Sequence, residues 1–146
     1  MARHFIGGEL LAAKRLDFLD GQFRTPEDVN RRPEAYWINR ALMLDLMETL
    51  PDGSFRPDQP VTRQTLSLWA EETIARLRGN SKVFSLYKGT PSPFTDLEST
   101  HYAYNAARIA VDLKMIAPDP DGKFDPDRAV SMDEGVAAVR NFVPAL

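Results

Sequence analysis

Four aspartates near the C-terminus are the densest group of possible metal ligands in this 146-residue sequence: Asp119, Asp121, Asp125 and Asp127. Calcium binds carboxylate and carbonyl oxygens, so this stretch could hold calcium. Its spacing departs from that of an EF-hand loop, because Gly122 is the fourth residue counted from Asp119 and not the sixth. A solvated acidic turn accounts for the same residues, and we predict no cofactor.

The sequence lacks the residue patterns of catalytic sites. Its two histidines, His4 and His101, have neither the neighbours of a metal site nor those of a catalytic triad. His101 is better placed to form a hydrogen bond at the start of a helix. Nucleophile-elbow, P-loop and dinucleotide-binding motifs are also absent from the sequence. We therefore predict that the chain is not an enzyme.

Two arginines could bind an anionic ligand. Arg63 and Arg31 each follow a residue that can cap a helix, so each is expected in a first helical turn. Backbone amides and the positive helix end favour an anion there, and a guanidinium can fork onto a carboxylate. Alternatively, Arg63 pins a loop by a salt bridge to a nearby carboxylate, such as that of Asp52 or Asp58.

One loop pattern recurs three times. Each copy reads Asp-Gly-x-Phe, and six residues after its phenylalanine stands a valine followed by a possible helix cap. Glycine accepts the positive φ of a tight turn without steric cost, and the phenylalanine can anchor the loop on a core. The loop residues are Asp20, Gly21 and Phe23, then Asp52, Gly53 and Phe55, then Asp121, Gly122 and Phe124. The caps are Asn30, Thr62 and Ser131, and Glu134 completes a capping box with Ser131.

Helices are expected on both sides of these loops. The stretch from the cap at Asn30 to about Leu50 is apolar nearly all round, so we expect a buried central helix that includes Trp37 and Leu44. Further helices are expected over residues 4–19, 63–78, 101–116 and 132–143, and Tyr102 is expected on the buried face of its helix. Residues 83–87 are too apolar for a free linker and should pack on the domain or on a partner.

Composition limits the possible partners. A net charge of −3 argues against a general nucleic-acid binder, which usually has a basic excess. No apolar run approaches the roughly 18 residues of a membrane-spanning helix. No apolar stretch of a signal peptide follows the first five residues. We therefore expect a protein that stays inside the cell, a piece of a longer chain, or one exported by lysis or with a partner.

The recurring residues resemble S-layer homology repeats. That family reads Phe-x-Asp-Val, His-Trp-Ala, a helix, a Pro-Asp-Gly-x-Phe-x-Pro-Asp loop and a Thr-Arg-Ala-Glu helix start. The matching segments are 94–97, 101–103 and 121–127 in one repeat, 51–58 and 61–63 in another, and 20–24 and 29–31 in the third. We place repeat one at about 4–49, repeat two at about 34–79 with a helix shared between them, a connector at 80–93, and repeat three at 94–146, all in a single domain.

The resemblance implies an all-α fold, with three helix-loop-helix repeats in a pseudo-threefold arrangement around a central helical core. It also implies a non-catalytic module that attaches a protein to bacterial cell-wall polysaccharide, often pyruvylated, in grooves between repeats. An exported protein of this kind would lie at the cell envelope. The family arginine is typically near the ligand, so Arg63 and Arg31 are candidate glycan-binding residues, and Trp37 and Tyr102 are candidate sugar-stacking residues.

Departures from the family pattern leave two functions open. Repeat three has Met132 in place of the family arginine, and the motif glutamate survives only as Glu134, with Thr65 and Pro33 at the other two positions. These changes preserve the loops but erode the glycan grooves. The first function is a carbohydrate-binding anchor, and the second is a small structural or adaptor subunit that uses the fold for protein–protein contacts. Binding to purified wall polysaccharide distinguishes the two.

Overall fold

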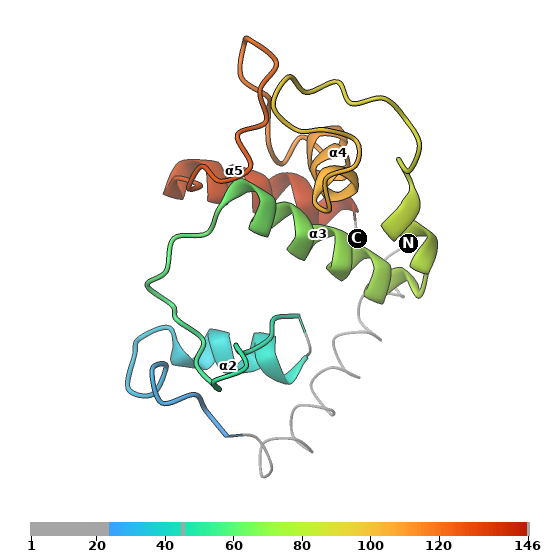
Figure 1. Cartoon of the computed structure of the whole chain (residues 1–146). Helices are drawn as coiled ribbons and strands as arrows, with labels where there is room; N and C mark the ends of the chain where they lie inside the picture. The colour runs from blue at the N-terminus through green and yellow to red at the C-terminus, as the bar shows by residue number, and fades with distance from the viewer. Residues whose placement is uncertain (1–23, 45, 146) are drawn as a thin grey trace. The chain divides into compact units, whose positions relative to one another are not determined.

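The computed structural model describes residues 24–44 and 46–145 (Figure 1). Four α-helices lie in these residues: α2 (Ala35–Met43), α3 (Arg63–Arg78), α4 (Tyr104–Asp112) and α5 (Met132–Phe142). Two 3-10 helices, η1 (Ser81–Ser85) and η2 (Val143–Ala145), complete the regular structure of this part, which contains no β-strand. The prediction of a helical fold is confirmed, and a pseudo-threefold arrangement stays a prediction.

The chain divides into an N-terminal unit, residues 1–59, and a C-terminal unit, residues 60–146. The loop residues Asp20, Gly21 and Phe23, and the helix expected over 4–19, lie outside the described residues. The longest described helix, α3, has 16 residues. Within the described ranges no helix is both long and apolar enough to cross a membrane.

The long buried helix that the sequence predicts up to Leu50 is wrong. The helix α2 ends at Met43, because the chain turns there and the amide of Leu46 bonds back to the carbonyl of Ala41 at 2.9 Å. Trp37 is 71% exposed and Leu44 is only half-buried. The apolar residues after the turn belong to a loop. Because the prediction counted them as part of one helix, it overestimated the buried surface of α2.

Asn30 does not cap α2, which corrects a second prediction. The N-cap of α2 is Glu34, whose side chain makes no capping hydrogen bond, and Asn30 lies in a turn in which its amide bonds to the carbonyl of Pro26 at 3.1 Å. Val29 is fully buried beside this turn. The valine therefore anchors the start of a repeat, and the resemblance of Val29-Asn30 to a capped helix start was misleading.

A carboxylate holds the Asp-Gly loop of each described repeat. Asp28 accepts hydrogen bonds from the amides of Phe55 (3.1 Å) and Arg56 (2.6 Å), and the latter contact lowers the pKa of Asp28. Asp96 accepts in the same way from the amides of Phe124 and Asp125, both at 2.7 Å. The two repeats thus share one construction, in which an aspartate that precedes the first helix fixes the loop that follows it.

Equivalent helices of the two repeats begin 69 residues apart. Ala35 and Tyr104 open α2 and α4, while Arg63 and Met132 open α3 and α5. The loop glycines also correspond, with φ of 79° at Gly53 and 80° at Gly122. With this offset of 69 residues, Trp37 corresponds to Ala106. Tyr102 stands where the family's His-Trp-Ala motif has its tryptophan, and it corresponds to Pro33.

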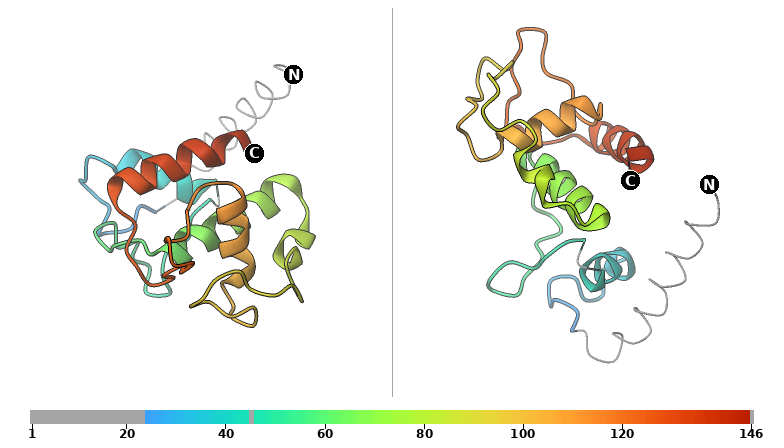
Figure 2. Two further views of the ribbon diagram at one scale, coloured as in Figure 1. Left: turned by 90° about the horizontal axis from the view of Figure 1, so that it is seen from above. Right: turned by 90° about the vertical axis from the view of Figure 1, so that its right-hand side faces the viewer.

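The core of the C-terminal unit forms where α4 packs against α3 (Figure 2). Alanines permit this close approach because their side chains are small. Aromatic rings fill the remaining space, with Trp69 on α3 lying 5.2 Å from Phe142 on α5, and Phe94 lying 5.2 Å from Phe124 between their ring centroids. The fully buried alanines are Ala70, Ala103, Ala106, Ala107, Ala110 and Ala138.

The helix caps in this unit follow from local sequence. Thr62 accepts a hydrogen bond from the amide of Thr65 at the start of α3, and Gly79 ends that helix in the left-handed region with φ of 58°. Ser131 and Glu134 form a reciprocal capping box at the start of α5. These short-range hydrogen bonds fix where α3 and α5 begin, and so position the residues that line the site below.

The connector and the start of α4 depart from the sequence predictions. Within residues 83–87, Val83 is buried and Tyr87 is half-buried, whereas Phe84 and Leu86 are exposed, so the segment packs through only part of its apolar surface. Tyr102 was predicted to be buried but is exposed, because α4 begins only at Tyr104. His101 accepts a hydrogen bond from the amide of Ala103 at 3.2 Å, which confirms its role at the helix start.

Candidate binding pocket at Arg63

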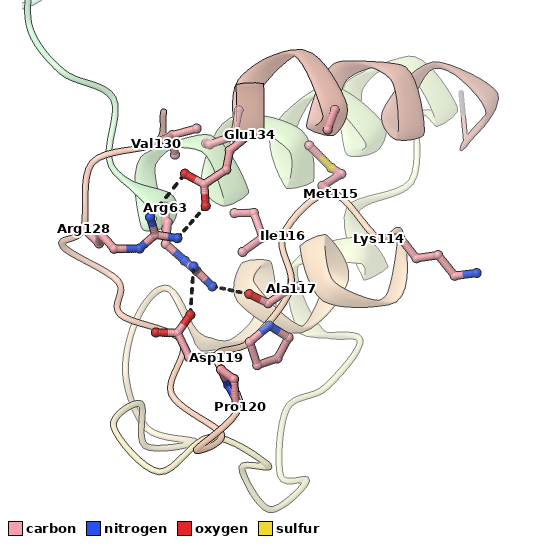
Figure 3. A pocket seen from close by; sticks show the side chains of 13 residues that line it. Arg63, Lys114, Met115, Ile116, Ala117, Asp119, Pro120, Arg128, Val130 and Glu134 are labelled. Atoms are coloured by element: carbon pink, nitrogen blue, oxygen red, sulfur yellow. Dashed lines mark hydrogen bonds and ion pairs between the residues drawn. The ribbon is translucent and has the colours of Figure 1, made fainter. Parts of the chain in front are cut away.

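A pocket of about 380 Å³ lies within the C-terminal unit (Figure 3). Its walls come from the first turns of α3, the segment 114–120 that follows α4, and the segment 128–137 that leads into α5. The charged lining residues are Arg63, Lys114, Asp119, Arg128 and Glu134, and the apolar ones include Leu66, Met115, Ile116 and Val130. The pocket thus combines an apolar lining with charged groups.

The backbone places Arg63 between the two repeats. Its amide donates to the carbonyl of Arg128 at 3.0 Å, and the next amide along α3 donates to the carbonyl of Pro126 at 3.0 Å. An isolated β-bridge joins Thr62 to Ala129 beside these bonds. The start of α3 is therefore fixed on the loop of the following repeat, and its first side chain points into that repeat.

The side chain of Arg63 is 2% exposed and binds the segment that follows α4. Its Nη2 donates to the carbonyl of Ala117 at 2.6 Å, Nη1 lies 3.8 Å from a carboxylate oxygen of Asp119, and the guanidinium lies 5.1 Å from the centroid of the Phe124 ring. Burial lowers the pKa of Arg63, and the nearby Arg128 guanidinium adds to this effect. Among the described residues its Nε has no hydrogen-bond partner.

These contacts correct the salt-bridge partners that we expected for Arg63. Asp52 instead accepts hydrogen bonds from Ser54 and from the Arg56 guanidinium, and its pKa is lowered to about 2, chiefly by the Ser54 hydroxyl. Asp58 pairs with Arg32. Arg63 pins a loop as the alternative interpretation proposed, but the loop is that of the next repeat. The pinned segment lies 54 residues further along the chain.

Arg128 and Glu134 form an ion pair along one edge of the pocket. Two hydrogen bonds join them at 2.5 and 3.2 Å. The hydrogen bond from Arg128 is the main reason that the pKa of Glu134 is lowered to about 2, and the bond from the Ser131 amide is the second. The hydrogen bond to Glu134 in turn raises the pKa of Arg128. The capping box thereby also orients a guanidinium at the pocket edge.

Lys114 lies elsewhere along the pocket lining. It is exposed, its backbone has a φ of 57°, and its carbonyl accepts a hydrogen bond from the Asn141 side chain at 2.6 Å. Figure 3 shows its side chain pointing away from the group formed by Arg63, Arg128 and Glu134. Within the described part of the chain its ammonium forms no ion pair, so it is available to an anionic ligand.

The four aspartates suggested for calcium do not gather into one group in the part of the chain that the structure describes. Across the described ranges, no three or more acidic or histidine side chains come together in a group that could hold a metal. Asp121 lies 3.3 Å from the Lys123 ammonium, and Asp127 accepts from Gln64 at 2.6 Å. Asp119 and Asp125 are neighbours, and the pKa of Asp125 is raised because its protonated form can donate a hydrogen bond to the Asp119 carboxylate. The group is split because Asp121 and Asp127 face other partners.

The remaining glycan-binding candidates lie outside this pocket. Arg31 is exposed in a left-handed backbone conformation with φ of 69°. Trp37 packs edge-on against Tyr36, with ring centroids 5.0 Å apart. Tyr102 donates from its hydroxyl to the Gln64 side chain at 2.7 Å. The structure brings only Arg63 of the four candidates into the pocket lining.

Sequence reasoning missed Lys114 and Arg128 and assigned Asp119 to a different site. Arg128 carried a usable signal, because it lies six residues before Glu134, a capping-box residue that can also accept from it. Lys114 carried no such signal, since its position depends on the backbone conformation of the residues that follow α4.

The sequence pattern of the S-layer homology domain family matches residues 32–66 and 93–131, slightly more than half of the chain. The chain belongs to the S-layer homology domain family. The two matched segments contain both described Asp-Gly loops and the charged residues of the pocket except Glu134, and they account for two repeats. A third repeat stays a prediction.

Three relatives carry names that refer to the cell surface or to anchoring. "Cell surface glycoprotein 1" of Acetivibrio thermocellus is 32% identical over 93 residues, which is 64% of this chain and 4% of that protein. "Cell surface protein" of Thermoanaerobacter kivui is 27% identical over 73% of this chain and 14% of its own length. "Cellulosome-anchoring protein" of Acetivibrio thermocellus is 27% identical over 66% of this chain and 20% of its own length. The chain thus spans at most a fifth of these relatives, and no solved structure matches it.

Proposed function

We propose that this chain is a non-catalytic module that attaches a protein to bacterial cell-wall polysaccharide, and that the pocket at Arg63 is its binding site. Membership of the S-layer homology family supports this function. So do the names of the relatives, which describe cell-surface and cellulosome-anchoring proteins. The proposal places the chain in the cell envelope.

The charge of the pocket carries the proposal. Three cations and two carboxylates line it, in a chain whose net charge is −3. A pyruvylated polysaccharide brings carboxylates that pair with cations and hydroxyls that donate to carboxylates. Leu66 and Val130, which line the pocket and are only half-buried, offer apolar surface to the faces of sugar rings. The pocket therefore matches an anionic saccharide in both charge and polarity.

The charged residues have different roles in this proposal. Arg63 is buried and already donates to Ala117, so it builds the pocket wall and contributes positive potential. Lys114 is the group that meets a ligand carboxylate where the ligand extends beyond Arg63, because its side chain points away from Arg63, is exposed and forms no ion pair with a described residue. Arg128 is solvent-accessible but held by Glu134, so it can offer the ligand its remaining donors.

Co-sedimentation with purified pyruvylated wall polysaccharide tests this function. We expect saturable binding by the full chain and about a tenfold loss in Lys114→Glu, which places a carboxylate where a cation met the ligand. Lys88→Glu is the matched control, since it makes the same change of charge at an exposed residue outside the pocket. Equal losses in both variants, or no binding by the wild type, would contradict the proposal.

A second function, protein–protein contact within an assembly, is favoured by one specific observation. The helix α5 exposes a row of apolar side chains. Such a row on a protein surface is typical of an interaction site. The two functions are compatible, because the row and the pocket have no residue in common.

A further inference from the structure

One face of α5 is apolar and exposed. Met132, Val136, Val139 and Val143 are 81%, 43%, 48% and 53% exposed. Successive members of this row are four, three and four residues apart, which is the spacing of the apolar seam through which two helices pair in a coiled coil. We call these four residues the α5 seam. The seam begins at the first residue of α5 and ends one residue beyond its last.

The equivalent face of α3 shows what such a face does in this fold. The residues 69 positions before the seam are Arg63, Ser67, Ala70 and Ile74, and none is more than 5% exposed. Ala70 and Ile74 belong to the core that forms where α3 packs against α4, and Arg63 contacts the segment that follows α4. The structure thus contains the same helix face twice, once covered by a neighbouring helix and once exposed. The seam has the position of a helix-docking face.

Two charged residues flank the seam on the same side. Asp133 follows Met132 and Arg140 follows Val139, and both side chains are exposed. When two such helices pair antiparallel, residues on the same side of the seam face each other, so Asp133 of each copy meets Arg140 of the other. In a parallel pair they would face the opposite flank, where Gly135 and Phe142 carry no charge.

We propose that the α5 seam is a self-association surface through which two copies of this chain pair, with their α5 helices antiparallel. The apolar row supplies the contact, and two Asp133–Arg140 pairs select the second copy and its direction. The partner is thus defined by charge as well as by shape. This inference does not rest on glycan binding, because no seam residue lines the pocket.

Sedimentation velocity of the full chain, from micromolar to millimolar concentration, tests the pairing. We expect a monomer–dimer equilibrium that Val139→Asp weakens by about tenfold or more, since it buries a charge in the seam. Leu86→Asp is the matched control, because Leu86 is an exposed apolar residue on the connector. A wild type that stays monomeric at every concentration would overturn the proposal, as would an equal effect of the two variants.

A charge exchange tests the antiparallel direction without altering the apolar row. Asp133→Arg alone places only arginines at the four flanking positions of a pair, and Arg140→Asp alone places only aspartates there. Each variant should therefore associate at least about tenfold more weakly than the wild type. A mixture of the two variants restores opposite charges and should associate again. Failure of the mixture to associate while the wild type dimerises would overturn the antiparallel arrangement.

Discussion

Replacing Arg63 by alanine tests whether this residue pins the repeat that follows it. The side chain is almost fully buried and contacts three groups of the segment between α4 and α5. Arg63→Ala removes all of these contacts and leaves the carbonyl of Ala117 without its donor. The substitution changes the free energy of the unfolded chain only slightly, so the loss of stability arises mainly in the folded state.

The contacts set the magnitude. A hydrogen bond from a charged donor contributes about 1.5–3 kcal/mol, and a cation over an aromatic ring about 0.5–2 kcal/mol. Part of this is offset because alanine avoids burying a guanidinium whose Nε has no partner among the described residues. We expect the free energy of unfolding to fall by about 2–4 kcal/mol, within the range for breaking a buried polar contact. Arg63→Met should lose less, because methionine keeps part of the packing.

Urea denaturation of the full chain, followed by tryptophan fluorescence, measures this change. Trp69 lies in the affected unit and reports on it directly. Arg31→Ala is the control, since Arg31 is exposed, and its effect should stay within about 0.5 kcal/mol. A loss below about 0.5 kcal/mol for Arg63→Ala would show that Arg63 does not pin the following repeat.

Four further substitutions test other parts of the fold. Asp96→Ala should lower the free energy of unfolding by about 2–4 kcal/mol, because it leaves the amides of Phe124 and Asp125 without an acceptor. A loss below about 0.5 kcal/mol in urea denaturation would show that Asp96 does not hold this loop. The ion pair lowers the pKa of Glu134 from 4.5 to about 2, so it stabilises the fold above pH 4.5 and ceases to do so as pH falls through about 2. The stability difference between wild type and Glu134→Gln should therefore be present at pH 7 and absent near pH 2, and an unchanged difference would refute this reasoning. Phe142→Ala should cost about 3–5 kcal/mol, whereas Val139→Ala at low concentration should cost under about 0.5 kcal/mol; similar losses would show that the two faces of α5 are not distinct.

Local sequence was sufficient for those parts of the fold that depend on neighbouring residues. The caps at Thr62 and Ser131 act through amides three residues away, and the turns at Gly53 and Gly122 need only a positive φ. Such features are visible in a few consecutive residues. They were also enough to identify the S-layer homology family, because its motifs are made of these loops and caps.

The errors arose where the outcome depends on distant residues. Asn30 and Trp37 have the local appearance of a cap and of a core residue, but Asp28 binds a loop 27 residues further on and thereby makes this stretch the start of a repeat. The end of α2 could not be located either, because the apolar residues beyond Met43 continue the helical pattern into a loop. Apolar content alone does not reveal which residues another element covers.

The pocket could be predicted only in part for the same reason. The family motif singled out Arg63, but its partners Ala117 and Asp119 lie more than 50 residues away in sequence. Lys114 is part of the pocket lining because the chain turns through this left-handed residue after α4. No pattern of residue types marks that turn, since glycine or asparagine would be the usual residue there.

Calorimetric titration of the full chain with purified wall polysaccharide, native and after removal of its pyruvate groups, tests whether the pocket binds an anionic saccharide. We expect saturable binding of the native polymer and at least about a tenfold weaker affinity for the stripped polymer, because the carboxylate that meets Lys114 is lost. Lys114→Glu should remove most of this preference. Absence of saturable binding, or equal affinity for both polymers, would contradict the assignment of this pocket to an anionic cell-wall polysaccharide.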